Sequence, residues 1–174
     1  MAPLVPTPFE NPDSGNRLDR LALDFPNGLP GFETSRRFVL QLQPALAPIA
    51  TLQSAEQSPD SSAVCFLVVP VALLVKDYAL LVTMEDLRTL GLQEEGQAQG
   101  PAPGTFSNVL CLAILTVPKD GPITANLLAP VVVNLATCVA VQAVRADAAY
   151  SHQHPIATLQ AYPAEASCHG DASC

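Results

Sequence analysis

Short apolar runs rich in β-branched residues recur along this chain, and turn-forming residues separate them. Over residues 21–25 and 38–42, large apolar side chains alternate with smaller or polar ones, which is the pattern of a half-buried strand. The predicted strands are residues 21–25, 38–42, 49–54, 64–69, 78–83, 109–117, 131–135 and 139–144. Runs this short and this numerous predict an all-β (β-rich) fold, and a chain of 174 residues has room for a single small barrel-like domain.

One short helix is predicted within this series of strands. Thr83 precedes two acids as an N-cap, Leu87 and Leu90 share one face, and Gly91 can end the helix. We therefore expect a helix of about two turns.

The predicted domain occupies residues 17–160. Residues 1–16 hold four prolines and are expected to form an extended arm, and residues 161–174 are expected to form a poorly ordered tail. Residues 93–107 are rich in Gly, Gln, Pro and Ala, which predicts a flexible loop inside the domain. The N-terminus has no Lys or Arg before Arg17 and has prolines where a signal peptide needs an apolar run, so we expect no secretion by that route.

Residues 121–144 carry no charge over 24 positions, which is long enough to span a bilayer. The segment also contains two prolines, three amide side chains and clusters of valine. Two strands that are buried on both faces and joined by turns explain this composition better than a membrane helix. We expect no association with a membrane.

The chain is acidic and poor in charge. Its formal net charge is -8, its pI is about 4.6, and 14% of its residues are charged against a typical ~25%. A hydrophobic content of 49% supplies a core, which excludes wholesale disorder. An acidic surface repels phosphate, so direct nucleic-acid binding is disfavoured and a basic protein partner fits better.

Five cysteines are present, and Cys65, Cys111 and Cys138 stand inside apolar runs, where a free thiol behaves as a small hydrophobe. This usage suits a reducing cytoplasm. Cys168 and Cys174 lie in the polar tail, and their spacing matches no zinc template. We expect no metal and no cofactor.

A thiol enzyme is the alternative from a different functional class. Cys138 or Cys111 could be combined with His154 and Asp147 to make a small thiol-dependent hydrolase. The apolar neighbours of both cysteines instead predict burial, and the chain contains neither a nucleophile elbow nor a phosphate-binding glycine loop. The sequence therefore favours a protein without catalytic residues.

Two further segments stand out. Gly28-Leu29-Pro30-Gly31-Phe32-Glu33 predicts a tight turn that folds Leu29 and Phe32 back onto the core, and the alternative is an apolar knob offered to a partner. Asn126 is flanked by apolar residues, so we expect its amide to tie two backbone segments together.

Several segments, taken in order over residues 18–156, carry a resemblance to a known family. They are Phe25-x-Asn27-Gly28-Leu29-Pro30-Gly31-Phe32-Glu33, Phe38-Val39-Leu40, Leu52-Gln53-Ser54, Lys76-Asp77-Tyr78, Ala113-Ile114-Leu115-Thr116, Thr124-Ala125-Asn126-Leu127-x-Ala129-Pro130-Val131-Val132-Val133-Asn134, and Tyr150 with His154-Pro155-Ile156. In these motifs the chain resembles the FliW family of flagellar assembly factors.

The resemblance implies a non-enzymatic cytoplasmic protein that exchanges two protein partners. One is flagellin, bound before export, and the other is the translational regulator CsrA, whose repression of flagellin translation the protein relieves. Loss of one of the two partners in this homologue is an open alternative. We expect a monomer.

The acids Glu85, Asp86, Glu94 and Glu95 are the candidate contacts for CsrA, because a regulator that holds RNA phosphates must present cations. Solvated surface charge is the alternative interpretation of these four residues. Flagellin termini are amphipathic helical segments, which an apolar groove or an open sheet edge could cover.

Overall fold

The computed structural model describes residues 20–55, 63–92, 108–145, 147 and 149–156. The predicted arm, the loop at 93–107 and the tail lie outside these residues. The elements are β1 (Arg20–Asp24), β2 (Arg37–Leu42), the 3-10 helix η1 (Pro44–Leu46), β3 (Ala50–Ser54), β4 (Cys65–Pro70), the 3-10 helix η2 (Val71–Leu73), α1 (Met84–Leu90), β5 (Val109–Thr116), β6 (Thr124–Ala125), β7 (Val131–Asn134), β8 (Val139–Gln142) and β9 (His154–Pro155).

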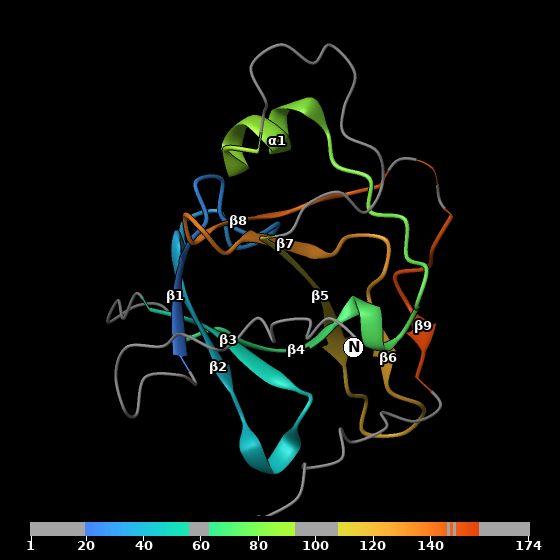
Figure 1. Cartoon of the computed structure of the whole chain (residues 1–174). Coiled ribbons are helices and arrows are strands. Elements are labelled where there is room, and N and C mark those ends of the chain that lie inside the picture. The colour runs from blue at the N-terminus through green and yellow to red at the C-terminus, as the bar shows by residue number, and fades with distance from the viewer. Residues whose placement is uncertain (1–19, 56–62, 93–107, 146, 148, 157–174) are drawn as a thin grey trace, which may run out of the picture.

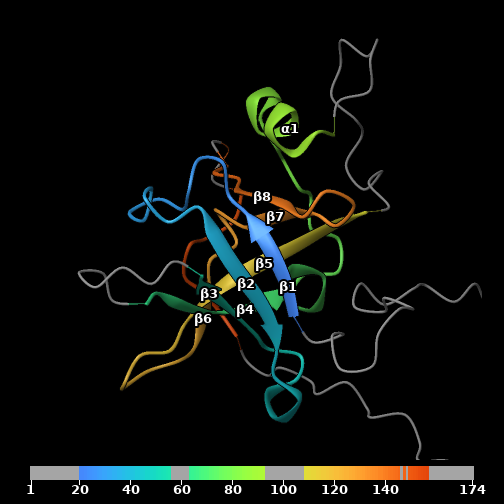
Figure 2. The same cartoon turned by 90° about the vertical axis from the view of Figure 1, so that its left-hand side faces the viewer.

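Seven of the strands close into a barrel, as the sequence predicts. Their order is β4-β3-β2-β1-β8-β7-β5, and β5 returns to pair with β4. β1 and β8 meet in parallel at a single residue pair, Asp24 with Val139, whereas the other barrel neighbours are antiparallel. β6 and β9 extend the sheet beyond β5, outside the barrel (Figure 1). In the view of Figure 2, β1 and β2 run side by side across the near face.

Alternate residues of the strands fill the barrel. Leu23 of β1, Phe38 and Leu40 of β2 and Leu52 of β3 are at most 1% exposed. Phe25 follows β1 and packs its ring edge-on against Phe38, with 4.9 Å between ring centroids. The period-two pattern therefore marks the inward faces of these strands.

The uncharged run at 121–144 forms strands in the barrel and its extension. All four residues of β7 are buried: Val131 and Val133 face the barrel core, while Val132 packs with Leu90, Val141 and Ala143 on the outside. A strand covered on both faces reads as a continuous apolar run. Within the described residues, no helix is both long and apolar enough to cross a membrane.

Helix α1 confirms the predicted caps. Thr83 accepts a hydrogen bond from the Asp86 amide at 3.1 Å, and Gly91 ends the helix in the left-handed conformation with φ 67°. Leu87 and Leu90 are buried, and the side chain of Asn134 donates to the Leu90 carbonyl at 2.9 Å. These contacts fix α1 on the outer side of β7 and β8 (Figure 1).

The predicted strand at 78–83 is wrong. These residues pair with no strand in the described part of the chain. β4 and β5 pair directly with each other, through Val68 and Ile114 among other pairs, so no ladder position is open between them. The segment instead carries the chain across the outside of the barrel to α1.

Candidate functional site

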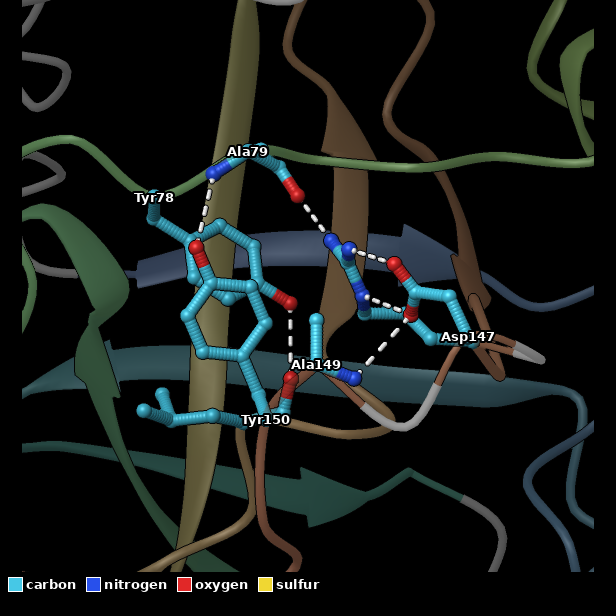
Figure 3. A network of polar contacts seen from close by, with 7 residues as sticks. Tyr78, Ala79, Asp147, Ala149 and Tyr150 are labelled. Atoms are coloured by element: carbon cyan, nitrogen blue, oxygen red, sulfur yellow. Dashed lines mark hydrogen bonds and ion pairs between the residues drawn. The ribbon is translucent and has the colours of Figure 1, made fainter.

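Three of the motifs singled out in the sequence converge beside the barrel. β9 pairs with β6, which brings His154 opposite Ala125. The Tyr78 hydroxyl donates to the Leu127 carbonyl at 2.7 Å. The rings of Tyr78 and Tyr150 lie with their centroids 4.5 Å apart (Figure 3). Segments near residues 78, 127 and 150 therefore form one unit.

Arg145 stands at the centre of this unit. Its side chain is 2% exposed, and its guanidinium lies 4.7 Å from the ring centroid of Tyr150 and 5.5 Å from that of Tyr78. It donates to the Ala79 carbonyl, and it binds Asp147 through Nε at 3.0 Å and Nη2 at 2.5 Å. We call Tyr78, Ala79, Arg145, Asp147 and Tyr150 the Arg145 cluster.

Hydrogen bonds complete the cluster. The Ala79 amide donates to the Tyr150 hydroxyl at 3.2 Å, so both backbone groups of Ala79 are bound. Within the described residues, every buried side-chain nitrogen and oxygen has a hydrogen-bond partner. The Arg145 cluster is thus a hydrogen-bonded network that holds separate segments together.

The electrostatics of the cluster follow from these contacts. Hydrogen bonds from Arg145 hold the pKa of the Asp147 carboxyl below its usual value, and the same bonds raise the pKa of Arg145. Burial raises the pKa of Tyr78 to about 12. Burial also raises the pKa of Cys111, which packs nearby, to about 12. Both groups are therefore neutral at physiological pH.

The residues of the alternative hydrolase have other roles. Asp147 binds Arg145, so its carboxylate is engaged away from any histidine. Cys111 is a protonated thiol in an apolar cluster, and a thiolate is what nucleophilic attack needs. Cys138 packs against the barrel core in a turn, at φ 58°. Within the described residues, no group of His, Cys, Asp and Glu is arranged to hold a metal ion.

Cys65 stands inside an apolar run, yet it is exposed. Cys65 pairs across the ladder with Gln53, and the side chains of such a pair lie on the same face of the sheet. Gln53 is exposed as well, so this face points to solvent. Cys111 and Cys138 are partly buried, as their apolar neighbours predict.

The turn at 28–33 folds Leu29 onto the core as predicted, but it leaves Phe32 partly exposed. Leu29 is 1% exposed and belongs to the barrel core, whereas Phe32 is 37% exposed and rests edge-on against Phe66, with 5.5 Å between ring centroids. Gly28 and Gly31 take positive φ values of 67° and 83°. The Gly31 amide donates to the Glu33 carboxylate at 2.8 Å, which lowers the pKa of Glu33. Pro30 is exposed between the two glycines.

Asn126 ties the chain together differently from the prediction. Its side chain accepts from the Ala129 amide at 3.0 Å and so closes its own turn. The link to a distant segment comes from its backbone amide, which donates to the Ile114 carbonyl at 2.9 Å. Asn126 is half-buried.

The four candidate acids do not form one described patch. Glu85 is exposed on α1, while the Asp86 carboxylate accepts from the Thr83 hydroxyl at 2.7 Å and so belongs to the helix cap. Glu94 and Glu95 lie outside the described residues.

Sequence reasoning missed Arg145, although a signal for it exists. The arginine follows a run of apolar residues directly, and Asp147 stands two positions later. A cation next to a buried strand needs a partner, and the nearest acid in sequence supplies it here.

Comparison with known proteins identifies the family. A model of the FliW protein family matches residues 16–156. The flagellar assembly factor FliW of Pseudothermotoga lettingae is 34% identical over 141 residues, which are 78% of each chain. That of Bacillus licheniformis is 33% identical over 133 residues, covering 76% of this chain and 82% of its own.

A solved structure agrees with these sequence matches. The crystal structure of a flagellar assembly factor FliW superposes with a TM-score of 0.59 at 26% identity, over 86% of this chain and 93% of that one. The match over residues 16–156 spans the barrel, β6, β9 and the Arg145 cluster. The chain belongs to the FliW family of flagellar assembly factors.

Proposed function

We propose that this protein binds unassembled flagellin in the cytoplasm and antagonises the RNA-binding translational regulator CsrA. Export of flagellin then releases the protein to bind CsrA, and repression of flagellin translation is relieved. The observation that carries this proposal is the family match across the whole barrel, together with the resemblance of the motifs that meet at the Arg145 cluster. The protein acts by stoichiometric binding and has no catalytic turnover.

The state of the thiols supports binding without catalysis. Cys111, with its pKa raised to about 12 by burial, stays protonated at neutral pH. The carboxylate that a Cys–His pair would need for orientation, Asp147, is bound by Arg145.

The net negative charge of the chain supports a cationic partner such as CsrA. This charge is not spread evenly along the chain. The described residues contain seven Asp or Glu and seven Lys or Arg, so this part has no net charge. The remaining nine acids and one arginine carry the whole net charge of -8. Attraction to a cationic surface therefore comes from the segments outside the described barrel, Glu94 and Glu95 among them.

Exposed apolar side chains support a second partner with amphipathic segments, which need an apolar surface to cover them. Flagellin is such a partner. Large hydrophobic side chains between 37% and 56% exposed are Phe32, Leu46, Leu73, Leu81, Met84, Val117 and Val144. Single exposed hydrophobics are ordinary, so these residues supply contact area without selecting one surface.

Retention on the immobilised protein tests the proposal. Purified CsrA and purified flagellin of the same source are passed over it separately. We expect each to be retained at equal stoichiometry. Retention of neither partner contradicts the proposal, and retention of only one contradicts the exchange.

Alkylation of the native protein tests the rival hydrolase. We expect the exposed Cys65 to react fast with a thiol reagent and Cys111 to react slowly, because the Cys111 thiol is partly buried and protonated. Peptide mapping after a short pulse distinguishes the two sites. Rapid labelling of Cys111 or Cys138 would favour the hydrolase.

A further inference from the structure

Residues 78–83, which we call the strap, lie across the outside of the barrel and lead into α1. Leu80 and Val82 pack against the apolar outer face of β7 and β8, whereas Leu81 between them is 45% exposed. The same outer face holds Leu90 of α1. Strap and helix therefore form one continuous cover over this face.

The strap lacks the ladder hydrogen bonds that hold the strands. Its start is held by side chains instead: Tyr78 donates to the Leu127 carbonyl, and Ala79 is bound through both its amide and its carbonyl. Two of these three bonds come from the segment after β8, namely from Tyr150 and Arg145. The attachment of the strap thus depends on the Arg145 cluster.

The far end of the cover is held by few groups. Leu87 and Leu90 are buried, and Asn134 donates to the Leu90 carbonyl. Helix α1 has only seven residues, and a helix this short is not stable in water without packing. If the strap leaves the barrel, α1 has little to keep it folded on its own.

Opening of this cover leaves no buried charge without a partner. Arg145 and Asp147 belong to the same segment, so their ion pair stays intact when Ala79 moves away. Asp147 is 38% exposed, so the pair already borders on water. The surface uncovered under Leu80, Val82 and Leu90 is apolar and includes Val132, Val141 and Ala143. Departure of Tyr78 also uncovers part of the apolar cluster that contains Leu127.

We propose that the strap and α1, residues 78–92, open from the closed barrel as one unit, and that Arg145 is the latch that sets how often they open. Arg145 suits this role because one guanidinium holds Ala79 by a hydrogen bond and contacts both tyrosine rings. Arg145 is a positioning residue that acts through the strap. Local opening of such units without global unfolding is a general property of folded proteins.

Hydrogen exchange of the native protein tests the opening. Reporter amides in the unit are those of Leu87 and Leu92, which donate to carbonyls within it. Barrel reporters are the amides of the β2–β3 ladder. We expect Leu87 and Leu92 to exchange faster than the barrel and with a weaker dependence on denaturant. Exchange of both sets with the same denaturant dependence would overturn the proposal.

A pair of arginine variants tests the latch. In Arg145→Met, the amides of Leu87 and Leu92 are expected to exchange at least about tenfold faster, while the barrel amides keep their rates. Arg88→Met is the matched control, because Arg88 is exposed on α1 and lies outside the latch. Equal acceleration of both sets, or no acceleration at Leu87 and Leu92, overturns the role of Arg145.

A milder variant covers the case in which Arg145→Met does not fold. Tyr150→Phe removes only the hydroxyl that accepts from the Ala79 amide. It is expected to accelerate Leu87 and Leu92 by a smaller factor and to leave the barrel amides unchanged. An unchanged rate at Leu87 and Leu92 in this variant would also contradict the latch.

Discussion

Gly28 occupies a position that has no room for a side chain. Its φ is 67°, and an added Cβ would lie 2.7 Å from the Glu33 Cα and 2.9 Å from two backbone carbonyl oxygens. We expect Gly28→Ala to lower the free energy of unfolding by about 2–4 kcal/mol, from strain at positive φ plus overpacking against backbone. Chemical denaturation measures this loss.

Gly31 gives the matched control in the same turn. Its φ is 83°, yet an added Cβ meets no atom within 4 Å. Gly31→Ala should therefore cost only the conformational strain, about 1–2 kcal/mol. Equal losses in the two variants would show that the close approach at Gly28 does not matter.

The hydroxyl of Tyr78 should ionise at a higher pH than that of an ordinary tyrosine. Because burial raises its pKa to about 12, the folded state holds this proton more tightly than the unfolded state, whose tyrosines titrate near 10. The stability that this group contributes is therefore complete below pH ~10 and is lost as the pH rises toward ~12. Ultraviolet absorbance of tyrosinate should show an ionisation at about pH 12 that Tyr78→Phe removes. Persistence of this ionisation in that variant would assign it elsewhere.

At the scale of the elements, the sequence predicted two kinds of feature correctly. These are contacts between residues close in sequence, and strands whose apolar side chains recur at every second position. Alternation marked β1 and β2, and each cap of α1 bonds to residues within one helical turn of it. Residues 78–83 have strand-like composition, yet the direct pairing of β4 with β5 leaves them no ladder position. β6 and β9 are two residues long, too short to show a period.

The cap of α1 gives a test within a single element. Thr83→Ala removes the hydroxyl that accepts from the Asp86 amide and should destabilise the protein by about 1 kcal/mol. Thr89→Ala, in the same helix, removes a hydroxyl that donates back to the Glu85 carbonyl. This control should be neutral or slightly stabilising, because alanine has the higher helix propensity. Thermal or chemical denaturation compares the two, and equal losses would contradict the assigned cap.

At the scale of the whole molecule, the sequence predicted the closed barrel and missed the centre of the candidate site. Apolar runs and turn residues are local signals, and they located the seven strands of the barrel but not β6 and β9. The contact between Arg145 and Ala79 joins residues 66 positions apart, and only the closed barrel with its β6–β9 extension brings them together. Tyr78 and Tyr150 were each singled out, but their shared partner was not.

The distribution of charge makes a prediction about association with CsrA. Glu94→Gln with Glu95→Gln should slow association severalfold at low salt, because these acids have no nearby cation in sequence. Asp77→Asn with Glu85→Gln makes the same change in net charge, but Lys76 adjoins Asp77 and Arg88 follows Glu85 by three positions. We expect the smaller effect from this control. Stopped-flow binding compares the two, and equal slowing would mean that only total charge matters.

Partner exchange is the central claim, and competition measured by isothermal titration calorimetry tests it most directly. The protein is titrated with CsrA alone, with flagellin alone, and with CsrA after saturation by flagellin. We predict binding of each partner alone, and weakening of CsrA binding by prior flagellin through a coupling free energy of at least ~1–3 kcal/mol. CsrA affinity that flagellin leaves unchanged would contradict the exchange.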